Sequence, residues 1–163
     1  MKPTVSRRRD SIEELERAYI SVLTDLTTLV QSVPPDSLYQ HAQGIPGSIG
    51  ENVIKSAGTL EQTLGGLTTN LWDDPFEWTL PETLSSPDLI VQYLREVEVA
   101  RARAFARFVD DSALGKYIAV PSGEQKSIES VLVDALQKAT SYQHRAAEMK
   151  KMLSADGVAG FII

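Results

Sequence analysis

The stretch SIESVLVDALQKATSYQHRAAEMKKML, residues 127–153, has the clearest helical pattern in the chain. No glycine or proline interrupts it, so at about 1.5 Å per residue a helix of roughly 40 Å can form. Ser127 suits the N-cap, and Lys150 and Lys151 suit the negative end of the helix dipole. We predict a long helix that ends near Leu153, with Gly157 as its stop. Its apolar side carries Ile128, Val131, Leu132, Ala135, Leu136, Ala139, Tyr142, Ala146, Met149 and Leu153.

A second strong helix is predicted over residues 10–33. Ser11 and Glu14 have the spacing of a capping box, in which the serine side chain caps the first turn. An apolar stripe at helical spacing then runs from Ile12 to Val33. Pro34 and Pro35 follow, and proline cannot continue a helix. The helix is therefore expected to end there.

Two further helices have clear boundary signals. Ser48 and Glu51 repeat the capping-box spacing, and the helix that they open is expected to stop at Gly65-Gly66. Ser86 followed by Pro87 opens another helix, which reaches about Val109. The run 117–120 before the last helix is short and extended. We predict an all-α fold, a four-helix bundle with long crossover connections and no sheet. Long loops leave the order of the helices in space open.

The composition is that of one ordinary domain covering residues 1–163. The chain has 163 residues, 42% of them hydrophobic, and a net charge of −6. Nucleic acid is not expected as a partner, because the composition provides no basic surface to neutralise phosphates. Without cysteine the chain forms no disulfide, thiol nucleophile or thiolate metal site. No secretory signal and no membrane-spanning run is found, so we expect a cytoplasmic protein that does not contact a membrane.

Three segments are expected to lie outside the regular helices. Residues 1–9 are basic and are expected to be frayed. Residues 66–85 lack a helical or strand period and contain Trp72, Phe76 and Trp78, which we expect to plug one end of the core. A pocket lid or a dimer surface is the alternative for these aromatics. The tail 155–163 ends in apolar residues that need burial against the bundle or a partner.

Three segments together resemble the DinB/YfiT-like superfamily. They are PGSIGENVIKSAGTLEQTL (46–64), DDPFEWTLPETLSSPDLIVQYL (73–94) and SIESVLVDALQKATSYQHRAAEM (127–149). The resemblance covers most of the chain and implies a DinB-like four-helix bundle, often a homodimer. Many members hold a divalent metal with three histidines, one from the second helix and two, four residues apart, from the last. Some members act as thiol-dependent transferases or isomerases.

The resemblance places the superfamily's metal triad on four positions of this chain. His144 matches the second histidine of the last helix, and the first falls on Thr140. The histidine of the second helix falls on Lys55, or on Ser56 in the alternative register. A catalytic metal needs about three protein ligands, and a lysine would repel the cation. We therefore expect no metal or other cofactor.

Substitute ligands would change this expectation. If His41, Glu51, Asp134 or Glu148 converged on His144, they would hold zinc, nickel or iron. Without a metal, the four triad positions have two interpretations. They line a polar pocket for an anion or another small molecule, or they are ordinary surface positions, with His144 paired to Glu148 or Thr140 and Lys55 paired to Glu51.

Three functional hypotheses follow. The first is a DinB-like bundle that acts through a small-molecule pocket or a homodimer surface. The second is a metal- or thiol-dependent transferase or hydrolase that uses His144 with substitute ligands. The third is an interaction module whose contact surfaces are the aromatic connection and the C-terminal tail.

Overall fold

Four long α-helices make up most of the part of the chain that the structure describes. This computed structural model describes residues 8–75 and 79–161, with side chains through Ser154. The elements are α1 (Asp10–Gln31), η1 (Pro35–Ser37), α2 (Ile49–Thr69), α3 (Pro87–Ala106), η3 (Asp111–Gly115), β1 (Tyr117–Ala119), β2 (Gln125–Ser127) and α4 (Ile128–Phe161). The predominantly helical, all-α prediction is confirmed.

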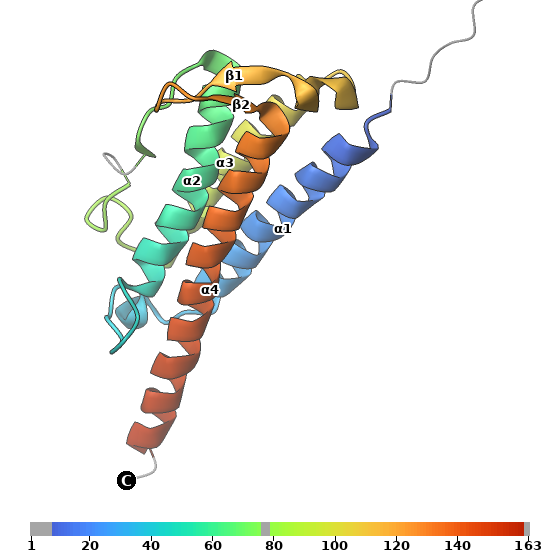
Figure 1. Ribbon diagram of the computed structural model, residues 1–163. Coiled ribbons are helices and arrows are strands. Elements are labelled where there is room, and N and C mark those ends of the chain that lie inside the picture. The colour runs from blue at the N-terminus through green and yellow to red at the C-terminus, as the bar shows by residue number, and fades with distance from the viewer. Residues whose placement is uncertain (1–7, 76–78, 162–163) are drawn as a thin grey trace, which may run out of the picture.

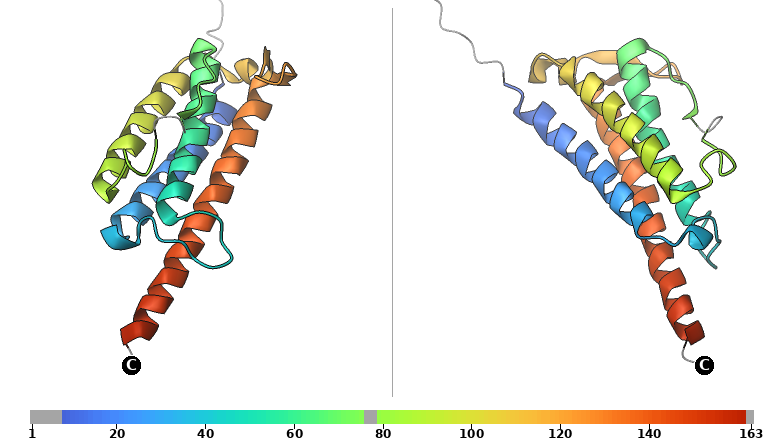
Figure 2. Two further views of the ribbon diagram at one scale, coloured as in Figure 1. Left: turned by 90° about the vertical axis from the view of Figure 1, so that its left-hand side faces the viewer. Right: turned by 180° about the vertical axis from the view of Figure 1, so that it is seen from behind.

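The helices pack in a ring in which α1 and α2 each lie between α3 and α4. Figures 1 and 2 show that α1 and α4 run in one direction and α2 and α3 in the other. The connection from residue 70 to residue 86 returns the chain along the bundle, so that α2 and α3 become parallel neighbours. The most extensive interface joins α2 and α4. This spatial order could not be read from loop length.

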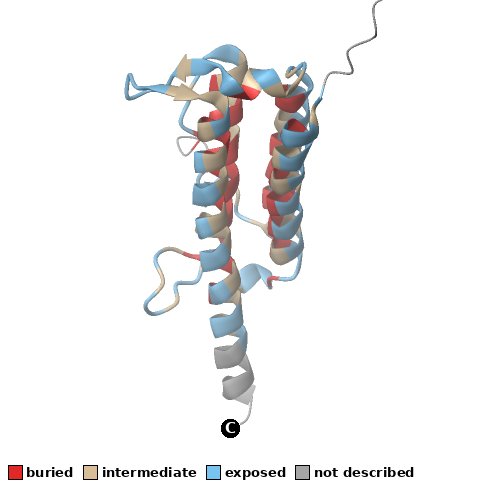
Figure 3. Cartoon of the chain, turned by 45° about the vertical axis from the view of Figure 1, so that its right-hand side comes forward, coloured by how far each residue is buried: buried red, intermediate tan, exposed pale blue. Residues whose placement is uncertain are grey.

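The core lies between the helices, on the faces coloured red in Figure 3. Tyr19 of α1 is fully buried, and its ring meets the ring of Phe105 of α3 edge to face at 5.2 Å between centroids. The Tyr19 hydroxyl donates a hydrogen bond of 2.7 Å to the carbonyl of Leu132 in α4. Burial raises the pKa of this hydroxyl. One side chain thus ties three helices together.

Serine side chains cap three helices as predicted. The hydroxyls of Ser48, Ser86 and Ser127 accept hydrogen bonds from backbone N–H groups in the first turns of α2, α3 and α4. The capping box predicted at Ser11 is wrong. The helix begins after Arg9, and the carboxylate of Asp111 accepts from the N–H groups of Ser11 and Ile12 at 3.2 and 3.0 Å. A side chain 100 residues away in the chain performs the capping.

The N-terminal segment joins the fold earlier than expected. Arg9, which we expected to be frayed, donates a hydrogen bond from Nη2 to the carbonyl of Phe105 at 3.1 Å. The carbonyl of Arg8 accepts from the N–H of Asp111 at 2.8 Å. Residues 1–7, by contrast, lie outside the described residues.

Two predicted helix stops are wrong. The helix α2 passes through Gly65-Gly66 and ends at Thr69, where Asn70 takes the left-handed conformation with φ of 57°. The helix α4 passes through Gly157 and reaches Phe161, so that it projects beyond the other helices (Figure 1). A helical glycine costs only about 1 kcal/mol relative to alanine, so a favourable neighbourhood overrides the signal.

The prediction of no sheet is also wrong. The extended run that begins at Tyr117 forms an antiparallel pair with β2, in which Tyr117 lies opposite Ser127. The turn between the strands places Gly123 at φ of +88°, a backbone conformation that suits glycine. The pairing was missed because β2, with the sequence Gln-Lys-Ser, lacks the apolar alternation of a strand.

Candidate functional site

The four positions matched to the metal triad do not all face one another. Ser56 is fully buried, and its hydroxyl donates a hydrogen bond of 2.7 Å to the carbonyl of Ala139 in α4. Thr140 is half-buried, whereas Lys55 and His144 are exposed. The structure therefore brings α2 and α4 into direct contact at this level. The contact is made by the Ser56 side chain and the Ala139 backbone. Lys55 and His144 face solvent.

The pairings expected for the two exposed residues are absent. In residues 8–75 and 79–161 we find no hydrogen bond or ion pair of His144, with Glu148 or Thr140 or any other residue. Lys55 likewise has no ion pair with Glu51 there. The Glu51 carboxylate accepts a hydrogen bond from the Ser48 hydroxyl at 3.2 Å and lies 3.9 Å from Nε2 of His41. Glu51 is thus engaged at the start of α2.

The possible metal ligands are dispersed. Asp134 lies 3.4 Å from the ammonium group of Lys126, and His41 contacts Glu51. No group of three histidine or carboxylate side chains that could hold a metal ion occurs within the described part of the chain. Since a catalytic divalent ion generally needs three protein ligands and an open position, these residues do not fit one.

A hollow opens between α2 and α4 on the far side of the Ser56 contact. We call it the α2–α4 hollow, and its volume is about 300 Å³. Its residues come from four separate segments, namely α2, the connection after α2, the hairpin and α4. This volume lies at the lower end of the range for small-molecule sites. The lining residues are Thr59, Gln62, Thr63, Trp72, Val120, Pro121, Lys126, Val131, Asp134, Ala135 and Lys138.

The α2 wall of the hollow is set by helical spacing. Thr59, Thr63 and Gly66 are separated by four and three residues, so they share one face of the helix. The Trp72 ring packs directly on Gly66, because a Cβ atom built there would lie 2.3, 2.3 and 2.4 Å from three ring carbons. The side-chain amide of Gln62 donates a hydrogen bond to the Trp72 carbonyl at 3.3 Å. Trp72 is thereby fixed at one end of this wall.

The threonines of this wall differ in their hydrogen bonding. The Thr59 hydroxyl donates to the Lys55 carbonyl at 2.8 Å. Thr63 is 8% exposed, and within the described residues its hydroxyl has no hydrogen-bond partner. Its oxygen is not one of the fully buried, unpartnered side-chain atoms of the described residues, so it is open to the hollow. Thr63 therefore offers a donor and an acceptor to a molecule in the hollow.

The α4 wall is apolar at its base and charged at its rim. Val131 and Ala135 are 6% and 5% exposed. Lys126 of β2 and Asp134 compensate each other across the rim at 3.4 Å. Lys138 is exposed and makes no ion pair within the described residues. Because Asp134 offsets the charge of Lys126, Lys138 gives the hollow one uncompensated positive charge.

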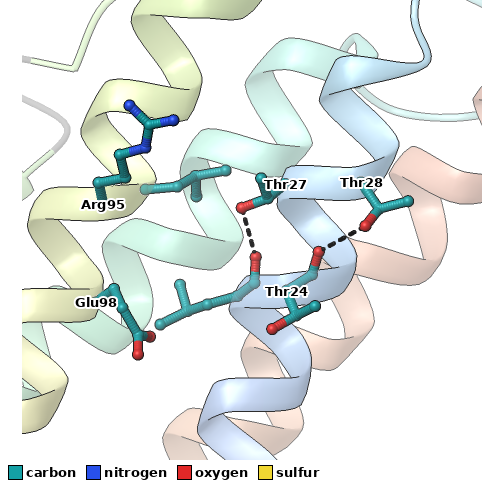
Figure 4. Close-up of a pocket in the computed structure, with 7 residues that line it drawn as sticks. Thr24, Thr27, Thr28, Arg95 and Glu98 are labelled. Atoms are coloured by element: carbon teal, nitrogen blue, oxygen red, sulfur yellow. Dashed lines mark hydrogen bonds between the residues drawn. The ribbon is translucent and has the colours of Figure 1, made fainter.

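A second hollow, between α1 and α3, is less suited to a ligand. Figure 4 shows three threonines of α1 across from Arg95 and Glu98 of α3. The hydroxyls of Thr27 and Thr28 donate to carbonyls of their own helix at 2.8 and 3.1 Å. Glu98 is already paired with Arg101. Most polar groups of this hollow are therefore already used within the protein.

The prediction that three aromatic side chains plug one end of the core can be compared with the structure at only one of them. Trp72 is half-buried and packs on α2, while Phe76 and Trp78 lie outside the described residues. Sequence reasoning missed Thr63 and Lys138. Both are polar residues at the edges of the apolar faces of α2 and α4. Such residues indicate a shared site only once the two helices are known to be neighbours.

Comparisons with known proteins add no relative. The chain matches no protein-family model, and no curated protein and no solved structure matches it at a significant level. The DinB/YfiT-like resemblance therefore stays a prediction. Within the described residues, no helix combines the length and apolar composition that crossing a membrane requires.

Proposed function

We propose that this chain is a divergent DinB-like helical bundle that binds a small organic molecule in the α2–α4 hollow and does not use the superfamily's metal. The observation that carries the proposal is a hollow of about 300 Å³, walled by Trp72, into which the unpartnered hydroxyl of Thr63 opens. Such a hydroxyl can donate a hydrogen bond to a bound molecule and accept one from it.

The DinB-like part of the proposal is supported by the neighbouring helices. A triad with one ligand from the second helix and two from the last requires those helices to be adjacent. Here α2 and α4 form the most extensive interface, and Ser56 touches the backbone next to Thr140. These contacts are consistent with the superfamily's arrangement.

A metal- or thiol-dependent transferase or hydrolase built on His144 has less support. His144 faces solvent, and the predicted substitute ligands are engaged elsewhere, Asp134 with Lys126 and Glu51 with Ser48. Metal analysis of protein purified without chelator, beside a His144→Ala variant, tests this alternative. Stoichiometric zinc, nickel or iron that is lost in the variant would favour the enzyme.

The binding proposal is tested by a ligand-observed NMR screen of soluble organic fragments against three proteins. They are the wild type, Thr63→Leu, which fills the hollow, and His144→Ala, which leaves it intact. We expect a set of fragments whose signals disappear with Thr63→Leu and persist with His144→Ala. Fragments that bind Thr63→Leu as well as the wild type would contradict the proposal.

A homodimer is the second part of the proposal. The end of α4 projects beyond the other helices (Figure 1), and Met152 near this end is 36% exposed. Light scattering coupled to size exclusion is expected to give twice the monomer mass of 17.9 kDa. A monomer mass at all concentrations would remove this part and leave the binding proposal unaffected.

A further inference from the structure

The two ends of the α2–α4 hollow have different chemistry. At one end Trp72 packs on Gly66, and at the other Lys138 lies next to the contact between Ser56 and Ala139. The helices are antiparallel, so the Ser56 end of α2 meets the Lys138 end of this stretch of α4 (Figure 1). From residue 59 to residue 66 of α2 the distance along the axis is about 10 Å. The hollow is therefore elongated, with an aromatic end and a cationic end.

The Trp72 end suits a flat ring. Its indole is held against the helix backbone by Gly66, and its carbonyl is held by Gln62. A ring that is already fixed loses little conformational freedom when a ligand packs against it. Aromatic pairs are favourable beyond the area that they bury. The apolar base at Val131 and Ala135 continues this surface.

The Lys138 end suits an anion. Lys126 is neutralised by Asp134, whereas Lys138 has no ion pair within residues 8–75 and 79–161. The Thr63 hydroxyl, midway along the α2 wall, is a free donor. A carboxylate accepts hydrogen bonds from both an ammonium and a hydroxyl.

We propose that the α2–α4 hollow takes an aromatic carboxylate, with the ring toward Trp72 and the carboxylate toward Lys138. This inference rests on the proposed function, since it names the ligand class of the same site. The length of about 10 Å accommodates a fused bicyclic ring with one carboxylate.

The test uses two probes of the same shape, 2-naphthoate and the neutral 2-naphthamide. Their affinities are measured by isothermal titration calorimetry with the wild type, Lys138→Gln and Lys55→Gln. Lys55 is the matched control, because it is an exposed lysine of α2 that does not line the hollow. We expect the wild type to bind naphthoate about 5-fold more tightly than naphthamide, as an exposed charge pair of about 1 kcal/mol gives.

Each variant separates one part of the inference. Lys138→Gln is expected to remove the preference for naphthoate and to leave naphthamide binding unchanged. Lys55→Gln is expected to change neither. Trp72→Leu is expected to weaken both probes by about 10-fold, since both lose the aromatic contact.

The unfavourable outcomes are distinguishable. Equal binding of both probes that is lost in Thr63→Leu would overturn the carboxylate inference and keep the α2–α4 hollow as a binding site. Binding that ignores both Thr63→Leu and Trp72→Leu would overturn the inference and the proposed function together. No binding of either probe would overturn the inference alone, because the fragment screen judges the site independently.

Discussion

The interface between α2 and α4 has a closed half and an open half. In the closed half Ser56 donates a hydrogen bond to the Ala139 carbonyl, and the Asn52 side-chain amide lies 3.6 Å from the Met149 sulfur. In the open half the facing side chains are Thr59, Thr63 and others of the α2–α4 hollow. The same two helices thus pack directly against each other in one half of their interface and leave a hollow in the other.

The difference teaches that helix packing and site formation are separable. Small side chains at Ser56 and Ala139 let the backbones approach closely and close the interface. Space remains in the open half because segments from outside the helix pair, Trp72 and the β-hairpin, form part of the wall. The resemblance pointed to the closed half, whereas the available volume lies in the open one.

The largest expected effect comes from enlarging one residue in each half. Ser56→Leu inserts bulk where no space exists and should lower the free energy of unfolding by about 3 kcal/mol. Thr63→Leu extends into the hollow and should change it by less than about 1 kcal/mol. Urea unfolding followed by circular dichroism measures both. Equal losses would show that the open half is packed as tightly as the closed half.

A second prediction concerns the contact that fixes Trp72. Gly66→Val places a side chain where the ring lies and should lower the free energy of unfolding by about 2 kcal/mol. The control is the same change in a Trp72→Ala background, where the loss should mostly disappear because the clash is gone. An equal loss in both backgrounds would mean that the ring does not pack on Gly66.

The sequence predicts some parts of the fold and of the candidate site, but not others. The helices were predictable because apolar positions at helical spacing and the caps at Ser48, Ser86 and Ser127 are local signals. The order of the helices in space and the cap of α1 by Asp111 were not, because they join residues far apart in the chain. Lys138 and Thr63 were missed for the same reason, since each becomes a site residue only when α2 faces α4.

A third prediction contrasts a local with a distant cap of α1. Asp111→Ala removes the acceptor of the Ser11 and Ile12 N–H groups and should lower the free energy of unfolding by about 1 kcal/mol. Ser11→Ala should change it by less than about 0.5 kcal/mol, because the Ser11 side chain does not cap the helix. The same urea experiment measures both. A larger loss for Ser11→Ala would restore the local capping box.

The smallest expected effect concerns Glu61 of α2. Its side chain lines a different hollow, which lies between α2 and α3. Burial raises the pKa of its carboxyl, and the Tyr93 hydroxyl lowers it only in part. Because the folded pKa exceeds the unfolded value of about 4.3, ionisation disfavours the fold. This penalty is absent below the unfolded pKa and grows as the pH rises through the folded pKa.

Glu61→Gln stays neutral and escapes this penalty. Its stability relative to the wild type should therefore be higher at pH 8 than at pH 4, by less than the loss expected for Asp111→Ala. Urea titrations at the two pH values give the comparison. A stability difference that is independent of pH would show that the Glu61 pKa is unperturbed.

The central claim, that the open half of the α2–α4 interface is the binding site, is tested most directly by mapping 2-naphthoate on the ¹H–¹⁵N spectrum of the labelled protein. We predict saturable shifts at residues 59–63, at Trp72 and at residues 131–138. The amides of Lys55 and His144 should shift least. Shifts concentrated at Lys55, Thr140 and His144 would contradict the claim and return the site to the positions of the metal triad.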